Sequence, residues 1–181
     1  MSVTIPNPIQ VELIPHDPFW IDMAEDEAGQ LKLALGEVAS DIHHIGSTAI
    51  PTIIAKPIID LLAVVRSFDE LDTRRAHLEA VDYIWCGELG IKNRVYCYKN
   101  EPDTQKRLFQ LHIFQQNNPK VEQHLAFKKR LLSDQNLARE YERLKQQCQL
   151  KHPNDSHAYS GCKDQWFSAI ENNFAQAGQS F

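Results

Sequence analysis

Asp60 is the residue whose setting points most directly to chemistry. It lies in the run KPIIDLLAVV (56–65), which is otherwise apolar on both faces and so predicts a central strand covered on each side. Burying an unpaired carboxylate in such a strand costs several kcal/mol, so Asp60 needs a partner. Two kinds of partner satisfy this need: a lysine or arginine in a structural salt bridge, or a metal ion or ligand.

A short strand over 42–45 is expected to end in the turn Gly46-Ser47-Thr48. Glycine lets a ligand approach the backbone closely, and the exposed N–H groups of such a turn attract negative charge. Alone, a Gly-Ser pair is typical of an ordinary turn. Followed by the strand that carries Asp60, it predicts a phosphate-binding turn facing a carboxylate.

One histidine and one lysine near the turn are further candidates for ligand contacts. His43 and His44 are adjacent on a strand and face opposite ways, so one of them addresses the turn, unless it is hydrogen-bonded within the core. Lys56 precedes Pro57, which favours extended backbone and aims its ammonium towards the turn and a phosphate. Its alternative role, an ion pair with Asp60, is strained because four residues of strand span about 13 Å.

Further along the chain, Arg94 is a second candidate cation, with a solvated surface residue as the alternative. His112 lies between two apolar residues of an expected strand, and both a ligand contact and a hydrogen-bonded core position suit it. The run Lys128-Lys129-Arg130 lies on a helix rich in both charge signs and predicts a solvated face.

The segment HHIGSTAIPTIIAKPIIDLLAVV (43–65) resembles the signature of the GrpB family, which is similar in fold to the nucleotidyltransferase superfamily. The resemblance favours His44 over His43 and extends from about Val11 to Ala175. Beyond the signature it includes Trp20, Arg94, His112, Tyr141, Leu144, Lys145, Tyr159 and Lys163. In the superfamily, the Gly-Ser turn holds nucleotide phosphates, while an acid-x-acid pair on the next strand and a third acid bind magnesium.

The resemblance implies that Asp60 is both catalytic residue and Mg²⁺ ligand. It implies a ligand site made of His44, Gly46, Ser47, Thr48, Lys56, Arg94 and His112. The pattern is incomplete, however, because the same-face partner of Asp60 is Leu62 and the third acid position corresponds to His112. One aspartate cannot hold the two metals of the usual phosphoryl or nucleotidyl transfer.

Three functions are therefore compatible with the sequence. The first is a nucleotidyltransferase-like protein that binds a nucleotide or phosphorylated metabolite with Mg²⁺. The second is a non-catalytic nucleotide- or coenzyme-binding module with a degenerate metal site. The third is an interaction domain that uses the helices around Tyr141 and Trp166, although amphipathic stripes of this kind usually face the core.

Periodicity predicts an α/β fold with a mixed central sheet flanked by helices, as a single domain over 1–181 with an extended arm at 1–15. Helices are expected at 17–39 and 68–80, two within 119–151 that break at Ser133-Asp134, and one capped by Ser156 that runs to 174. Strands are expected at 42–45, 56–65, 83–86, 94–99 and 108–115.

Composition excludes several classes of protein. A net charge of -5 argues against binding to long nucleic acid, although a local site can still hold a small phosphorylated ligand. No apolar stretch approaches the roughly 20 residues needed to cross a membrane. The four cysteines form no C-x-x-C pair and no leader precedes them, which predicts reduced thiols in a cytoplasmic protein.

Overall fold

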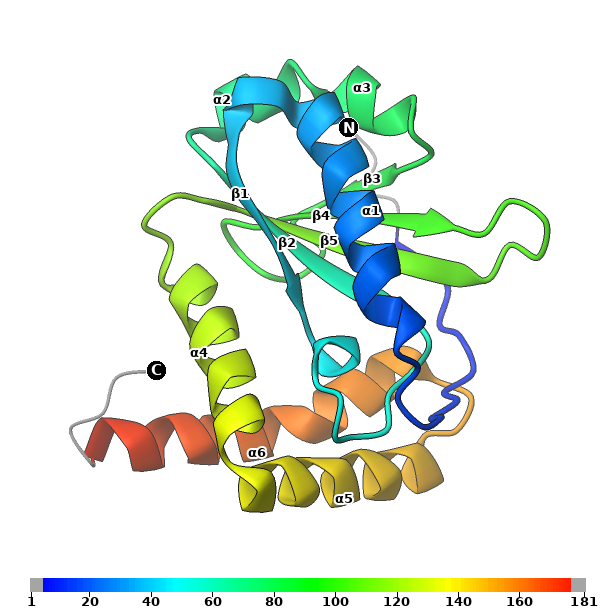
Figure 1. Ribbon diagram of the computed structural model, residues 1–181, viewed down its shortest axis with the longest axis vertical. Coiled ribbons are helices and arrows are strands. Elements are labelled where there is room, and N and C mark those ends of the chain that lie inside the picture. Colours follow the sequence, from blue (N-terminus) through cyan, green and yellow to red (C-terminus); the bar gives the residue numbers. More distant parts are fainter. Residues whose placement is uncertain (1–4, 177–181) are drawn as a thin grey trace.

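A five-stranded sheet in the order β1-β2-β5-β4-β3 organises the chain, as described for residues 5–176 by a computed structural model (Figure 1). Strands β2 and β5 are parallel and the other neighbouring pairs are antiparallel, so the predicted mixed sheet is confirmed. The strands are β1 (Ala39–Ile45), β2 (Ile59–Val65), β3 (Ile84–Gly87), β4 (Val95–Asn100) and β5 (Arg107–Gln115).

Strand β2 is covered on both faces, as its apolar composition predicts. Its odd-numbered residues pack into the main core with α1, whereas Leu62 and Val64 pack on the other face. Asp60 shares that second face because side chains alternate along a strand. The strand begins at Ile59 and not at Lys56, because Ala55 pairs with Ile14 of the arm and Pro57 has no N–H to donate.

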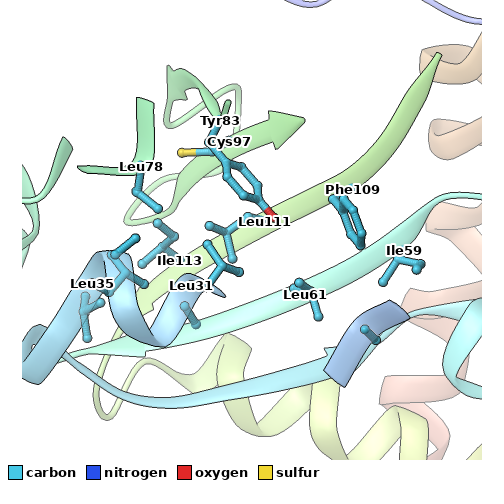
Figure 2. Close-up of a cluster of buried hydrophobic side chains, with 14 of the residues drawn as sticks. Leu31, Leu35, Ile59, Leu61, Leu78, Tyr83, Cys97, Phe109, Leu111 and Ile113 are labelled. Atoms are coloured by element: carbon cyan, nitrogen blue, oxygen red, sulfur yellow. The ribbon is translucent and has the colours of Figure 1, made fainter. Parts of the chain in front are cut away.

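The first face of the sheet is covered by α1 (Phe19–Leu35), α2 (Phe68–Asp72) and α3 (Arg75–Glu79). Figure 2 shows Leu31 and Leu35 of α1 and Leu78 of α3 directed at the strands of the main core. Gly36, with φ +58°, ends α1 before a single 3₁₀ turn, η1 (Gly36–Val38), and β1 then starts three residues earlier than expected.

The single helix expected over 68–80 was wrong: two short helices occupy this stretch. Ser67 caps the first of them by accepting a hydrogen bond from the N–H of Glu70. The Thr73 hydroxyl donates to the Glu70 carbonyl, a local bond that competes with continuation of the helix.

The second face carries α4 (Pro119–Ser133), α5 (Gln135–Lys151) and α6 (Ser156–Gln176). The predicted break at Ser133-Asp134 is confirmed, because Asp134 caps α5 by accepting from two backbone N–H groups. Asp155, and not Ser156, caps α6 in the same way. Ser156 instead accepts a hydrogen bond from the N–H of Ile9 and so fixes the arm.

The N-terminal arm is packed on the body from Ile9 onward, and Pro6 before it is also buried. Residues 1–4 lie outside the described range. The N–H of Val11 donates to the carbonyl of Pro153, and Ile14 pairs with Ala55. Across residues 5–176, none of the helices combines the length and apolarity that a membrane span requires.

The expectation of four reduced thiols was wrong for one pair. Cys148 of α5 and Cys162 of α6 form a disulfide, with their Cα atoms 5.8 Å apart. Cys86 and Cys97 are free and buried. The paired cysteines are 14 residues apart in sequence, and the α5–α6 turn, rather than a short motif, brings them together.

Candidate functional site

Asp60 and Gly46 lie side by side at the ends of two neighbouring strands. Asp60 is the second residue of β2 and pairs with Ile45, the last residue of β1, so the turn that begins at Gly46 passes directly over the carboxylate. Gly46 has φ +72°, and a Cβ built on it would overlap the carboxylate of Asp60. Glycine is therefore required here both for its conformation and for the close approach of Asp60.

A cavity of about 500 Å³ opens beside this pair, bounded by the turn, β2, β5 and helices α4, α5 and α6. We call it the cleft. Six of the predicted site residues line it: Gly46, Ser47, Thr48, Lys56, Asp60 and His112. His44 and Arg94 are not among its lining residues, but they contact two residues that are, Thr48 and His112.

Asp60 of β2 faces His112 of the neighbouring strand β5. Oδ1 of Asp60 lies 3.8 Å from Nε2 of His112, and the two side chains are 30% and 15% exposed. Burial raises the pKa of the Asp60 carboxyl, but His112, Lys56 and Lys163 outweigh burial, so the pKa lies below its ordinary value. The carboxylate therefore stays ionised and open to the cleft, and no lysine or arginine forms an ion pair with it among the described residues.

Arg94 holds the far side of the His112 ring. Its Nη1 lies 3.3 Å from Nδ1 of His112, and its Nη2 donates to the carbonyls of Glu88 and Leu89. With only 6% of its surface exposed, Arg94 is not the solvated residue offered as its alternative role. Arg94 lies outside the cleft lining and holds the His112 ring through this contact.

His44 supports the turn rather than the cavity. Its Nε2 lies 2.9 Å from the hydroxyl of Thr48, and its carbonyl accepts a hydrogen bond of 2.9 Å from Lys128. Burial, followed by the charge of Lys128, lowers the pKa of His44 to about 4, so the ring is neutral at ordinary pH. The prediction that the run 128–130 is a solvated face was thus wrong for Lys128, which reaches β1.

Lys56 lies over the ring of Tyr159, 5.2 Å from its centroid. It forms no ion pair with Asp60 within the described residues, in line with the strain expected for that contact. Burial, followed by the nearby charge of Lys163, lowers the pKa of Lys56 to about 8, while Asp60 opposes both effects. Lys56 is therefore a half-buried cation at the wall of the cleft.

Several cleft residues were absent from the predicted site. The most informative are Lys163 of α6, whose Nζ lies 4.4 Å from the Tyr159 centroid, and His124 of α4, whose ring lies 5.8 Å from that of His112. Tyr159 and Lys163 are four residues apart, which places them on one face of a helix. This four-residue spacing was the feature of the sequence that could have identified Lys163 as a site residue. The rest of the lining includes Gln110, Gln123, Phe127, Tyr141, Asp164 and Phe167.

The donor set at Asp60 fits one Mg²⁺ ion but not two. Leu62, where a second carboxylate would stand, is fully buried with Ile45, Val64 and Phe114. Within the described residues, no three His, Cys, Asp or Glu side chains are grouped closely enough to hold a metal ion. A single carboxylate suffices for a Mg²⁺ ion that also takes water and phosphate oxygens.

Comparison with known proteins identifies relatives along most of the chain. Residues 10–173 match the GrpB protein family. UPF0157 protein YqkA of Bacillus subtilis is 38% identical over 164 residues, which are 91% of this chain and 47% of the relative, so this chain spans about half of its length. Glutamate-rich protein GrpB of Alkalihalophilus pseudofirmus is 30% identical over 168 residues, which are 92% and 97% of the two chains.

A shorter segment of the chain is similar in sequence to part of an enzyme. A segment of 74 residues, 39% of this chain, is 40% identical to part of dephospho-CoA kinase from Mycobacterium tuberculosis. The matched part is 18% of that protein.

Solved structures confirm the expected fold. The crystal structure of the conserved protein GrpB from Enterococcus faecalis superposes with a TM-score of 0.80 at 34% identity, covering 90% of this chain and 96% of that one. The Cid1 poly(U) polymerase with MgGTP bound superposes with a TM-score of 0.50 at 16% identity, covering 68% and 41%. The second likeness shows that the fold is that of the nucleotidyltransferases.

Proposed function

This chain belongs to the GrpB protein family, and from that premise we propose that its cleft binds a nucleotide or another phosphorylated metabolite. The observation that carries the proposal is that Gly46, Asp60 and Lys56 face one cavity of about 500 Å³. A cavity of this size accommodates a small ligand of several rings or phosphate groups. The fold shared with Cid1, which binds MgGTP, supports a nucleotide as the first ligand to test.

The turn and Lys56 would bind the phosphates. The backbone N–H groups of Ser47 and Thr48 have no acceptor in the part of the chain that the structure describes, so both are available to an anion. Lys56 adds a positive charge to the lining of the cleft, beside the ring of Tyr159. Hydrogen bonds from such donors to phosphate oxygens are charge-assisted and are about twice as strong as neutral ones.

Asp60 would be the catalytic carboxylate and the Mg²⁺ ligand. When bound together with a phosphate group, Mg²⁺ would neutralise part of the negative charge of that phosphate. His112 keeps Asp60 ionised, and Arg94 fixes the orientation of His112. His44 orients the hydroxyl of Thr48 in the turn. The reaction that these roles suit is Mg²⁺-dependent nucleotidyl transfer with one protein carboxylate.

A second function, non-catalytic binding of a nucleotide or coenzyme, is favoured by Leu62. Because this side chain is sealed in an apolar cluster, the cleft has no carboxylate partner for Asp60 on the same strand. The segment similar to dephospho-CoA kinase adds dephospho-CoA to the ligands worth testing. Both functions suit a cytoplasmic protein, a location that fractionation of the native host would check.

Thermal denaturation with a panel of ligands tests both functions. The panel contains nucleoside triphosphates, dephospho-CoA and adenosine, each with Mg²⁺ and with EDTA. A ligand at about 100 times its Kd adds about 2.7 kcal/mol to the free energy of unfolding, which raises the Tm by roughly 5–10 °C for a chain of this size. Adenosine controls for binding that does not need phosphate.

The variant Asp60→Asn separates the two functions, and Asp164→Asn, another carboxylate of the cleft lining, is the matched control. A Mg²⁺-dependent Tm shift that Asp60→Asn alone abolishes supports the enzyme. A shift of equal size in EDTA and in Asp60→Asn supports the binding module. If none of the phosphorylated ligands shifts the Tm of the wild type, the proposed function is wrong.

A further inference from the structure

Two lysines from distant parts of the chain meet at one wall of the cleft. Lys56 precedes β2, whereas Lys163 lies in the second turn of α6, and both line the cavity. Their Nζ atoms lie 5.2 Å and 4.4 Å from the centroid of the same Tyr159 ring. Both ammonium groups therefore contact the same ring, near enough for the charge of Lys163 to lower the pKa of Lys56.

Within the part of the chain that the structure describes, neither ammonium has a protein anion bound to it. In the described residues, Lys56 and Lys163 take part in no ion pair and no side-chain hydrogen bond, and their contact with Tyr159 is their defined interaction. Asp60 attracts both from a longer distance, and Asp164 attracts Lys163. Holding two half-buried like charges together costs free energy that an anion between them would recover.

The ionisation of the pair agrees with this geometry. Burial lowers the pKa of Lys163 to about 8, and burial together with the charge of Lys163 lowers the pKa of Lys56 to about 8. A bound anion would favour the charged form of both. The two lysines therefore lack the anion that would stabilise their charged forms.

We propose that Lys56 and Lys163 form a metal-independent binding site for one phosphate group of the ligand, and that they supply the positive charge that a second Mg²⁺ ion would supply in a two-metal site. This inference rests on the proposed function and extends it to the α6 side of the cleft. The compound recognised is one with at least two phosphate groups, the first at the Gly46 turn and the second at the lysine pair.

The position of Leu62 explains why such a site is needed. A second metal requires a second carboxylate near Asp60, and the side chain at the position for it is enclosed under α4 with Val121 and Leu125. Fixed ammonium groups neutralise phosphate charge without that carboxylate. The lysines of the lining, which also include Lys120, outnumber its aspartates in a chain whose net charge is -5.

Pyrophosphate in EDTA is the probe that isolates the lysine pair from any metal. Binding is measured by isothermal titration calorimetry for the wild type, Lys56→Gln and Lys163→Gln. Each substitution is expected to weaken binding about 10- to 100-fold, since it removes one charge-assisted contact. Lys163→Arg keeps the charge and is expected to stay within a few-fold of the wild type. Lys129→Gln, an exposed lysine of α4 outside the cleft lining, is expected to leave the affinity unchanged.

Folding of the variants is checked by their Tm in the absence of ligand. Because each substitution removes a half-buried charge with no ion-pair partner, the Tm is expected to stay the same or rise. A variant that keeps its Tm and loses pyrophosphate affinity supports the inference. A variant that keeps both overturns it.

The outcomes distinguish this inference from the proposed function. Pyrophosphate binding that needs Mg²⁺, or that survives Lys163→Gln, overturns the lysine site while nucleotide binding still stands. Lysine-dependent binding of pyrophosphate in EDTA without binding of any nucleotide or coenzyme supports the lysine site and contradicts the proposed function. If neither pyrophosphate nor any nucleotide or coenzyme of the panel binds, both are wrong.

Discussion

Arg94 Nη1 lies 3.3 Å from His112 Nδ1, and this contact fixes which nitrogen of the ring carries the proton. An arginine side chain donates hydrogen bonds and accepts none, so Nδ1 must contribute its lone pair. The proton of the neutral ring therefore sits on Nε2, the atom that faces Asp60 at 3.8 Å. Arg94 thereby orients His112 as a donor towards the carboxylate, which makes it unsuited to act as a base at that nitrogen.

Replacing Arg94 tests this arrangement. In the wild type, ¹⁵N spectra of the imidazole are expected to show His112 protonated at Nε2, whereas Arg94→Met is expected to give a mixture of the two neutral tautomers. Arg107→Met is the control, because Arg107 bonds Asn100 and Tyr96 rather than His112. A wild-type His112 protonated at Nδ1 at neutral pH would contradict the assignment.

Gly46→Ala tests the contact between the turn and Asp60. The substitution forces a non-glycine residue to φ +72° and places a methyl group against the carboxylate, so it is expected to lower the free energy of unfolding by about 2–4 kcal/mol. Gly87→Ala is a matched control, because Gly87 has φ +68° but nothing within 4 Å of the added Cβ. It should cost only about 1 kcal/mol. Urea denaturation measures both.

Asp60→Ala in the Gly46→Ala background completes the test. Removing the carboxylate removes the overlap, so the second substitution is expected to restore about 1 kcal/mol or more of the loss. Equal costs for Gly46→Ala and Gly87→Ala would show that the backbone conformation alone, and not Asp60, requires glycine at this turn.

The strand that carries Asp60 could be predicted from the sequence because its pattern is local. An apolar run with one charged residue indicates a central strand, and the two-residue period of side chains identifies Leu62 as the neighbour on the same face. Both features are in the structure. The Gly-Ser turn was equally local, since it follows the preceding strand directly.

The other half of the cleft could not be predicted this way, because its residues meet only through the packing of helices. Lys163 reaches the site through α6, and Lys128 reaches the carbonyl of His44 through α4. Charge patterning along a helix does not tell which lysine turns towards a sheet. The disulfide was not predicted for the same reason: the turn between α5 and α6 brings Cys148 and Cys162 together.

His124 gives a prediction for the pH dependence of stability. Burial, followed by the charge of His112, lowers its pKa from 6.5 to about 4; Lys120 and Arg94 act in the same direction, and Asp60 opposes them. Between these pH values the unfolded chain binds a proton at this residue that the native chain does not bind. The free energy of unfolding should therefore fall as the pH is lowered through this window, by roughly 3 kcal/mol from this residue.

His124→Phe isolates that contribution, because its ring is of similar size and Phe114 is already a neighbour at 6.0 Å. Urea denaturation at about pH 7 and about pH 4.5 should show a smaller difference for the variant than for the wild type. His157→Phe, an exposed residue of α6 outside the cleft lining, serves as the control and should keep the wild-type difference. An unchanged difference in His124→Phe would contradict a buried neutral His124.

The disulfide between α5 and α6 predicts that reductant weakens the fold near Lys163, which directly follows Cys162. Breaking a link across 14 residues should lower the free energy of unfolding by about 3 kcal/mol, because the unfolded chain regains the freedom that the link removed. The Tm of protein purified without reductant is therefore expected to fall by roughly 6–12 °C when a reducing agent is added.

Thiol titration of the denatured protein should give two free thiols before reduction, from Cys86 and Cys97, and four after it. In Cys148→Ala/Cys162→Ala the reductant should have no effect on the Tm, and four free thiols before reduction in the wild type would show that the pair is open.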